Sequence, residues 1–193
     1  MIFADSHWGK TVVLLDGDLR NPTLYHRYGV KEDALSLEAV LRGNAPVDAV
    51  LSRRQSGRLT LALNSAPVED PTVCVNSSAM KELIAALAAQ ADIVVIDTPP
   101  CGQFSDAALY RQYADGILYV VQQDRAAITQ IVDAAERLCG RENKLLGYVL
   151  NGAEQMPQGY GKYGYGYGKY GYGYGKYGYG YGKSEQRDKV SNR

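Results

Sequence analysis

The sequence is poor in cysteine and histidine, the residues that most often form disulfide frameworks and zinc sites. It has three cysteines (Cys74, Cys101 and Cys139) and two histidines (His7 and His26). The odd number of cysteines and their spacings match no zinc pattern, and each histidine stands alone. A reducing cytoplasm is the natural compartment for such a chain, and a metal site would have to use other side chains.

Long apolar runs and an excess of charge of one sign are also missing. No run approaches the roughly 20 apolar residues that cross a membrane, and the first residues do not read as a secretion signal. The net charge is zero, so we expect no nucleic-acid partner. The zero hides an asymmetry, because residues 1–159 hold 14 Lys/Arg against 19 Asp/Glu and residues 160–193 hold 7 against 2. A basic tail on an acidic body indicates an anionic partner, contact with the body, or only solubility.

Short apolar runs alternate with helical patterns over most of the chain. The runs at 11–16, 59–63, 93–97, 116–121 and 145–150 are apolar on both faces, which is typical of parallel strands covered by helices. Helical periodicity occurs at 37–42, 78–90 and 126–139, with Ser36 as an expected cap and Gly43 and Gly140 as expected stops. This alternation predicts an α/β fold with a doubly wound, mostly parallel sheet over residues 1–153.

The last 40 residues, 154–193, have a different composition. The unit Lys-Tyr-Gly-Tyr-Gly-Tyr-Gly occurs three times, at 162–168, 169–175 and 176–182. Alternate glycines raise the entropy cost of ordering and remove the side chains a core would need, so this segment is predicted to be a disordered tail. It carries ten of the chain's sixteen tyrosines, namely Tyr160, Tyr163, Tyr165, Tyr167, Tyr170, Tyr172, Tyr174, Tyr177, Tyr179 and Tyr181.

Aspartates follow two of the predicted strands. Asp16 and Asp18 end the first run, and Asp97 ends the run Ile-Val-Val-Ile-Asp. Ligands of open parallel sheets bind outside the carboxyl ends of the strands, so these three carboxylates would meet at one rim if the strands are neighbours. Carboxylates there suit Mg²⁺ and the phosphates of a nucleotide, with Arg20 neutralising a phosphate or pairing with one of the aspartates. The alternative is that the acidic residues merely cap the following turns.

These motifs resemble those of a known family. Leu-Leu-Asp-Gly-Asp-Leu-Arg-Asn-Pro is similar to the second Walker-A-type motif of bacterial tyrosine kinases of capsular and exopolysaccharide biosynthesis, and Asp-Ile-Val-Val-Ile-Asp-Thr-Pro-Pro is similar to their Walker B motif. The similarity continues through Ser105-Asp106-Ala107, 114–116 and 146–151, and the tyrosine-rich end completes it. It implies a P-loop NTPase fold related to the partitioning ATPases.

The resemblance also implies roles for individual residues. Asp16, Asp18 and Asp97 would be catalytic and would hold Mg²⁺, Arg20 and Asn151 would contact ATP, and the tail tyrosines would accept phosphate from a neighbouring subunit. The implied partners are a membrane-embedded activator of the polysaccharide co-polymerase type, further copies of the chain and a tyrosine phosphatase. The implied location is cytoplasmic, peripheral at the inner face of the plasma membrane through that activator.

One expected motif does not precede Asp16. The family's main phosphate loop, Gly-x-Gly-Lys-Ser/Thr, should lie roughly thirty residues upstream, whereas only fifteen residues precede Asp16. We therefore expect the first strand and the phosphate loop to be missing, an apolar sheet edge to be exposed, and ATP to bind poorly. The chain would be a fragment of a longer kinase, or a natural protein that lost ATP hydrolysis.

Three functions remain open at this point. The first is a protein-tyrosine autokinase that regulates polysaccharide synthesis and export. The second is a non-catalytic phosphoacceptor or assembly module of the same fold. The third is a relative of the partitioning-type positioning ATPases, against which the ten tail tyrosines argue. The region 64–75 departs from the pattern that the family has near its subunit contact, so a closed ring is not implied.

Overall fold

The computed structural model describes residues 9–30, 36–54 and 57–153. The chain divides into two units, 1–154 and 155–193. The predicted tail and its ten tyrosines lie outside the described residues, as does His7. None of the described helices is long and apolar enough to cross a membrane.

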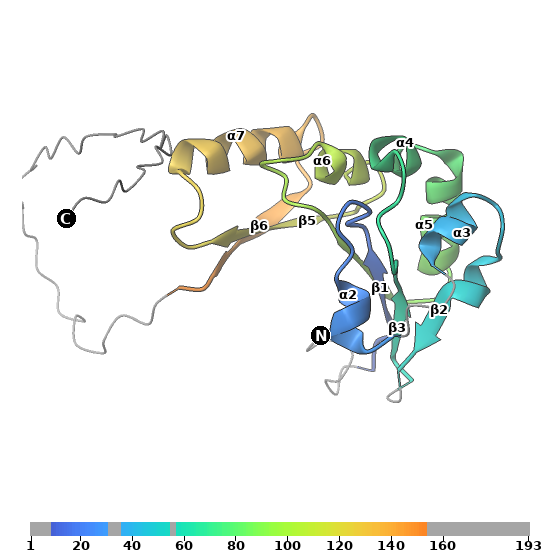
Figure 1. The fold of residues 1–193 in the computed structure, drawn as a ribbon. Coiled ribbons are helices and arrows are strands. Elements are labelled where there is room, and N and C mark those ends of the chain that lie inside the picture. The colour runs from blue at the N-terminus through green and yellow to red at the C-terminus, as the bar shows by residue number, and fades with distance from the viewer. Residues whose placement is uncertain (1–8, 31–35, 55–56, 154–193) are drawn as a thin grey trace, which may run out of the picture. The chain divides into compact units, whose positions relative to one another are not determined.

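A four-stranded sheet forms the first half of the described chain (Figure 1). Its order is β2-β3-β1-β4, with β1 at Val12–Asp16, β2 at Leu51–Arg53, β3 at Leu59–Ala62 and β4 at Ile93–Asp97. Strands β3, β1 and β4 run parallel, whereas the short β2 is antiparallel to β3. The register pairs Val12 with Leu59 on one side and with Ile93 on the other.

A second, two-stranded parallel sheet follows. It consists of β5 at Ile117–Gln122 and β6 at Leu145–Asn151.

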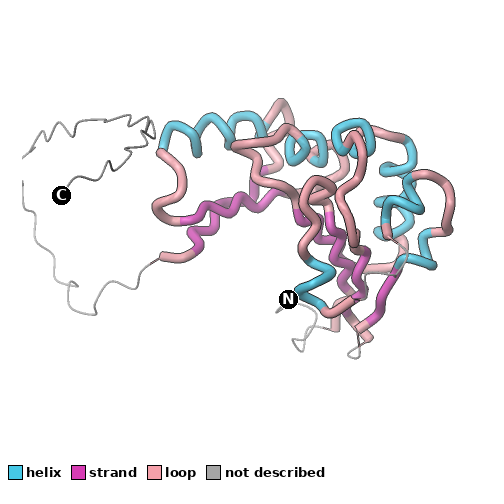
Figure 2. The backbone as a smooth tube through the Cα atoms, viewed as in Figure 1, coloured by secondary structure: helices cyan, strands magenta, loops and turns pink. Residues whose placement is uncertain are grey.

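Helices and strands alternate along the backbone (Figure 2). The helices are α2 at Leu24–Tyr28, α3 at Leu37–Leu41, the 3₁₀ turn η1 at Val47–Val50, α4 at Pro71–Val75, α5 at Ser78–Ala88, α6 at Asp106–Tyr110 and α7 at Ile128–Cys139.

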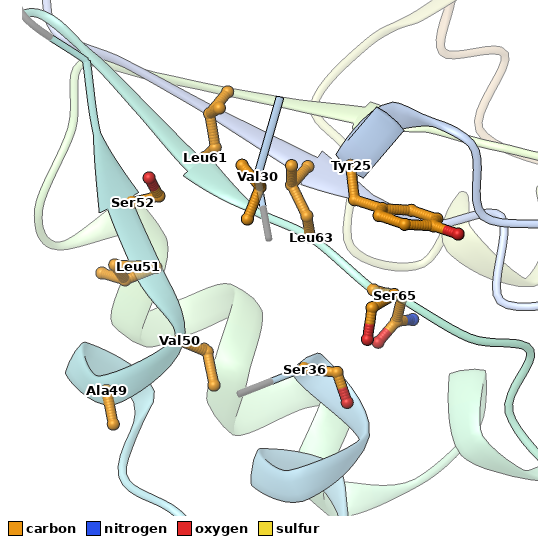
Figure 3. Close-up of a pocket in the computed structure, with 11 residues that line it drawn as sticks. Tyr25, Val30, Ser36, Ala49, Val50, Leu51, Ser52, Leu61, Leu63 and Ser65 are labelled. Atoms are coloured by element: carbon orange, nitrogen blue, oxygen red, sulfur yellow. The ribbon is translucent and has the colours of Figure 1, made fainter. Parts of the chain in front are cut away.

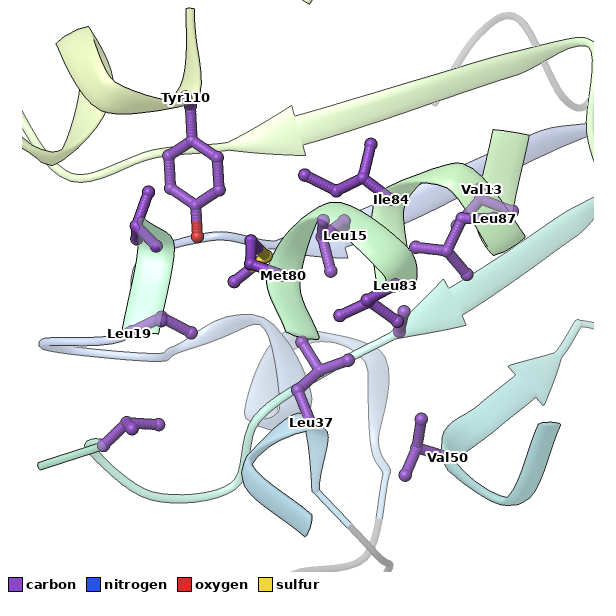
Figure 4. Close-up of a cluster of buried hydrophobic side chains, with 13 residues drawn as sticks. Val13, Leu15, Leu19, Leu37, Val50, Met80, Leu83, Ile84, Leu87 and Tyr110 are labelled. Carbon is purple, nitrogen blue, oxygen red and sulfur yellow. The ribbon is translucent and has the colours of Figure 1, made fainter. Parts of the chain in front are cut away.

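Helices cover both faces of the four-stranded sheet, because each face of β1 is apolar. Val13 and Leu15 point toward α5, whose Met80, Leu83 and Leu87 are buried in the same cluster (Figure 4). Val12, on the opposite face, packs with buried leucines of β3 and with partly buried residues of α2. This arrangement is the predicted doubly wound α/β fold.

The predicted strands and long helices are found within one or two residues of their expected ends. Gly140 ends α7, as expected, and Ser77 caps α5 by accepting a hydrogen bond from the Met80 amide at 3.1 Å. Ser36 is the N-cap residue of α3, as expected, but its side chain makes no capping hydrogen bond. The short elements β2, α2, α4 and α6 were not predicted, since three to five residues carry too little periodicity.

The exposed apolar sheet edge predicted from the sequence is found at β4. Among the described strands, β4 pairs with β1 alone. Its Ile93 and Val95 are 39% and 44% exposed, although both are large apolar residues. The edge ends at Asp97, beside the predicted site.

Candidate functional site

Two of the predicted site residues, Asp16 and Asp97, lie side by side at the carboxyl ends of adjacent parallel strands. Asp16 is the last residue of β1, Asp97 is the last residue of β4, and the two are register partners. The Gly17 amide donates a hydrogen bond to the Asp97 carbonyl at 2.7 Å, so the ladder continues one step past the strand ends. The β1–β4 pairing therefore forms the rim that the sequence predicted.

Asp16 is a buried carboxylate without a hydrogen-bonding partner of ordinary geometry. It is 1% exposed, and neither carboxylate oxygen has a partner among the described residues. Loss of water first, and the negative charges of Asp97 and Asp18 in addition, raise its pKa to about 7. The backbone amides of Asp18 and Asn64 oppose this rise but do not cancel it. An unpaired buried acid of this kind is costly unless a proton or a cation neutralises it.

The other two aspartates have different surroundings. Asp97 is exposed as a residue, yet partial loss of water around its carboxyl and the charge of Asp18 raise its pKa, while Arg27 opposes the rise. Asp18 is held by its own loop, because its Oδ1 accepts hydrogen bonds from the amides of Arg20 at 3.2 Å and Asn21 at 2.9 Å. The loop after β1 thus fixes Asp18 so that its charge acts on both neighbours.

Gly17 allows this close approach. A Cβ at this position would lie 2.6 Å from the Asp97 carbonyl oxygen and 2.8 Å from Cγ2 of Ile96. Both contacts are shorter than the van der Waals distance, and the Asp97 carbonyl belongs to the backbone of β4, which cannot move by itself. The glycine between Asp16 and Asp18 is therefore required for the two strand ends to meet.

Arg20 is held by side chains of α4 and α6. Its guanidinium forms a two-point ion pair with Asp106, which is itself 1% exposed, and donates from Nη2 to Thr72 Oγ1 at 2.9 Å. Thr72 in turn donates to Asp106 Oδ1 at 3.0 Å, and the Phe104 ring lies 4.6 Å from the guanidinium carbon. The pairing predicted for Arg20 does exist, but its partner is Asp106 and none of Asp16, Asp18 or Asp97.

Sequence reasoning missed the roles of Asp106 and Thr72 in this network. Asp106 opens the five-residue helix α6 and Thr72 lies in α4, and 34 positions separate them. The string Ser105-Asp106-Ala107 belonged to the resemblance, but nothing in it indicated a partner. A buried ion pair becomes visible only when the two segments are placed in space.

The donor set at the rim fits a hard cation such as Mg²⁺. Asp16 offers two unpaired oxygens, and Asp97 and Asp18 add negative charge beside them. No three acidic, histidine or cysteine side chains of the described part lie close enough to hold a metal ion together. Mg²⁺ needs only one or two protein carboxylates, since it keeps several waters and takes oxygens from substrate phosphates.

Asn151, the predicted adenine contact, ends β6 in the two-stranded sheet, opposite Gln122. The Asn151 carbonyl accepts a hydrogen bond from the Gln123 amide at 2.9 Å, and Asn151 is exposed. No hydrogen bond or ion pair of the described residues joins it to the aspartates of the first sheet. Its contact with a nucleotide stays a prediction.

A small cavity of about 120 Å³ lies behind the end of β3 and is lined by none of the three rim aspartates (Figure 3). Tyr25, Val50, Leu63 and Asn64 are among its lining residues, and the Asn64 amide also acts on Asp16. Residues 31–35, which follow its Val30, are outside the described part of the chain. The cavity therefore gives no support to a site of its own.

A comparison with protein-family models finds no match. Among curated proteins, the chain is similar to tyrosine-protein kinase YwqD of Bacillus subtilis (strain 168), with 32% identity over 166 residues that cover 85% of this chain and 68% of that protein. It is also similar to tyrosine-protein kinase CpsD of Streptococcus agalactiae, with 29% identity over 156 residues, which are 81% of this chain and 68% of the relative.

Solved structures show the same relationship. The VpsO kinase domain superposes with a TM-score of 0.68 at 26% identity, over 74% of this chain and 70% of that domain. The septum site-determining protein MinD of Pyrococcus horikoshii, solved in complex with Mg-ADP, has a TM-score of 0.60 at 22% identity, over 74% of this chain and 58% of that one, and shows the fold alone. The fold is that of the P-loop NTPases, and the identity to YwqD over two thirds of its length places this chain in the bacterial tyrosine kinase family.

Proposed function

We propose that the chain is the ATP- and Mg²⁺-dependent portion of a protein-tyrosine autokinase that regulates capsular or exopolysaccharide synthesis and export, with the tail tyrosines as acceptors. The observation that carries the proposal is Asp16, a buried carboxylate with both oxygens unpaired that faces Asp97 across two strand ends. Neither oxygen of Asp16 has a structural partner among the described residues. The rim is suited to a site where a cation and a reacting hydroxyl would sit.

The chemistry asks the protein mainly for positioning and charge neutralisation. Phosphoryl transfer proceeds in line with little covalent help from side chains, so an acidic rim that holds the metal and accepts a proton would supply the part of the site next to the acceptor. A carboxyl with a pKa of about 7 is also matched to proton abstraction from a tyrosine hydroxyl near neutral pH. When bound, Mg²⁺ would neutralise phosphate charge and favour the ionised form of Asp16. Asp18 would orient this rim through its two amide contacts.

Arg20 has a supporting part in this proposal. Its ion pair with buried Asp106 anchors the loop that carries Asp16 and Asp18, and its Nη2 donates to both Asp106 and Thr72. A contact of the guanidinium with the phosphates would require this pairing to open. The sequence Gly180-Tyr181-Gly182-Lys183-Ser184 has the short form of a phosphate loop, but it ends the tail repeat and lies outside the described residues.

The experiment that tests the proposal measures phosphate on the tail tyrosines and asks whether its presence depends on Asp16. Intact-mass spectrometry of the full chain from its native host should show phosphate on the ten tail tyrosines. An Asp16→Asn chain should lose it, whereas an Asp115→Asn chain, altered at an exposed acid, should keep it. Absence of phosphate from the unaltered chain would contradict the acceptor role.

The second candidate function, a non-catalytic phosphoacceptor, gives a different pattern in the same experiment. The tail of the Asp16→Asn chain would then carry as much phosphate as the unaltered chain, because another kinase supplies it. The observation that favours this candidate is the commitment of Arg20 to Asp106, which leaves the rim without a free cation from that loop. The membrane-embedded activator, the homo-oligomer and the tyrosine phosphatase belong to both candidates as proposed partners.

A further inference from the structure

Asp18 is held by the backbone of the loop that follows β1. Its Oδ1 accepts hydrogen bonds from the amides of Arg20 and Asn21, whereas none of the hydrogen bonds among the described residues uses its Oδ2. One oxygen of this carboxylate is therefore fixed by the loop, and the other remains for a cation at the rim. Whatever fixes the two amides also fixes the position of Asp18.

The side chain of Arg20 is held outside that loop. Its Nε and Nη2 donate to the two carboxylate oxygens of Asp106, and its Nη2 also donates to Thr72 Oγ1 at 2.9 Å. Arg20 is thus bonded at both ends, by its amide to Asp18 and by its guanidinium to α4 and α6. A change in the hold on the guanidinium reaches Asp18 through a single residue.

Thr72 bonds to both members of this ion pair. Its Oγ1 accepts a proton from Arg20 Nη2 and donates its own to Asp106 Oδ1 at 3.0 Å, so the hydroxyl is used in both directions. The direct contact of Nη2 with Asp106 Oδ1 is longer, at 3.2 Å. Without the hydroxyl, Nη2 would keep only this longer contact and the guanidinium would be less firmly oriented.

A simpler role for Thr72 would be to join α4 to α6, which lie side by side (Figure 1). Another hydrogen bond already does this, from Gln112 Nε2 just after α6 to Oδ1 of Asn76, the C-cap of α4, at 3.3 Å. That bond does not involve Arg20. Asp106 is 1% exposed and Thr72 is exposed, so the threonine is the outer member of a buried charge pair.

We propose that Thr72 is a positioning residue of the acidic rim, which holds Asp18 ready for a cation by orienting Arg20. It would touch neither the cation nor the substrate. Groups that orient the ligands of a metal without binding it commonly change the metal affinity by about 10- to 100-fold when they are removed. The inference rests on the proposed metal role of the rim and adds a residue of α4 to it.

Amide exchange followed by NMR measures the hold on Asp18 in the full chain without a metal. We expect the Arg20 and Asn21 amides to exchange about tenfold faster in Thr72→Val, because a hydrogen bond to charged groups is lost while both charges stay. Thr72→Ala should behave alike, and Thr72→Ser, which keeps the hydroxyl, should restore the rates. Gln112→Ala, the matched control, should leave them unchanged. The Val12 amide, bonded within the fold, reports folding in every variant.

Binding of Mn²⁺, which prefers the same oxygen ligands as Mg²⁺, measures the consequence for the rim. Titration of the full chain, followed by electron paramagnetic resonance, should show about tenfold weaker binding in Thr72→Val than in the unaltered chain or in Thr72→Ser. The same substitution in an Asp18→Asn chain should have no further effect, because Thr72 acts through Asp18. Equal weakening in both backgrounds would show a purely structural role and would overturn the proposal.

The other outcomes separate this inference from the proposed function. Unchanged exchange of the Arg20 and Asn21 amides in Thr72→Val and Thr72→Ala would overturn the proposal, as would an equal effect of Gln112→Ala. Faster exchange with an unchanged Mn²⁺ affinity would overturn the role of Thr72 in the site. If both amides respond as expected but the unaltered chain binds no Mn²⁺, the proposed metal site fails, whereas the hold of Thr72 on Asp18 is supported.

Discussion

At the scale of single residues, the rim is defined by one carboxyl that the fold has left without a partner. Asp16 is 1% exposed and has a pKa of about 7, above its ordinary value of 3.8. Because the folded-state pKa is raised, protonation stabilises the folded chain. The contribution of protonated Asp16 to the free energy of unfolding is most favourable below about pH 4, and it is lost as the pH rises through about 7.

We therefore expect Asp16→Asn to stabilise the Mg²⁺-free chain increasingly between pH 4 and pH 7. The difference in unfolding free energy from the unaltered chain should grow over this range by about 4 kcal/mol at most, and then stay constant. Urea unfolding at several pH values measures it. Asp115→Asn, at an exposed acid, should give a flat profile, and a flat profile for Asp16→Asn as well would show that the carboxyl is not perturbed.

Gly17 gives a second prediction at this scale. Gly17→Ala should lower the free energy of unfolding by about 1–3 kcal/mol, because the new Cβ would lie 2.6 Å from the Asp97 carbonyl. Gly102→Ala is the matched control, since a Cβ there meets nothing within 4 Å. Equal effects of the two substitutions in urea unfolding would show that the β1–β4 ends can separate without cost.

At the scale of elements, the two sheets differ in how well they are covered. Strands β1 and β3 have buried side chains on both faces, such as Val12, Val13 and Leu61. In the two-stranded sheet, Leu118 and Leu150 are exposed, and each strand has only one partner. Two-stranded sheets are marginal by themselves, so this sheet depends on further packing such as that of α7 on β5.

We predict that hydrogen exchange reports this difference directly. Amides of β5 and β6 should exchange at least about tenfold faster than those of β1 and β3, because few buried contacts oppose local opening. Mass spectrometry of proteolytic peptides resolves the two regions. Helix α5, which buries Met80 and Leu83, serves as the protected control. Uniform protection across both sheets would mean that one cooperative unit contains them.

At the scale of the whole molecule, charge argues against tight nucleotide binding by this chain alone. Asp16, Asp18 and Asp97 all repel phosphate, and Arg20 is paired with Asp106. We expect calorimetry of the full chain with ATP and Mg²⁺ to show no affinity in the micromolar range. Asp106→Asn is the informative variant, because it releases Arg20 and should improve binding if the ion pair withholds that cation. A micromolar dissociation constant for ATP and the unaltered chain would contradict this prediction.

The strands and the acidic rim were predictable from the sequence alone. The apolar runs before Asp16 and Asp97 predicted two parallel strands that end at one rim, and the register of β1 and β4 confirms it. Period-two and helical patterns are local, so a single sequence contains them. The resemblance carried by the aspartate motifs was confirmed by the identity to YwqD.

Tertiary structure decided everything that depends on distant segments meeting. Arg20 and Asp106 are 86 positions apart, and only the packing of the loop after β1 against α6 made them partners. The two unpaired oxygens of Asp16 are likewise a property of placement. The sequence by itself determined which strands and acids exist, because those depend on local pattern. The fold decided which acid stays unpaired and which acid pairs with Arg20, because burial and hydrogen bonding are settled between elements.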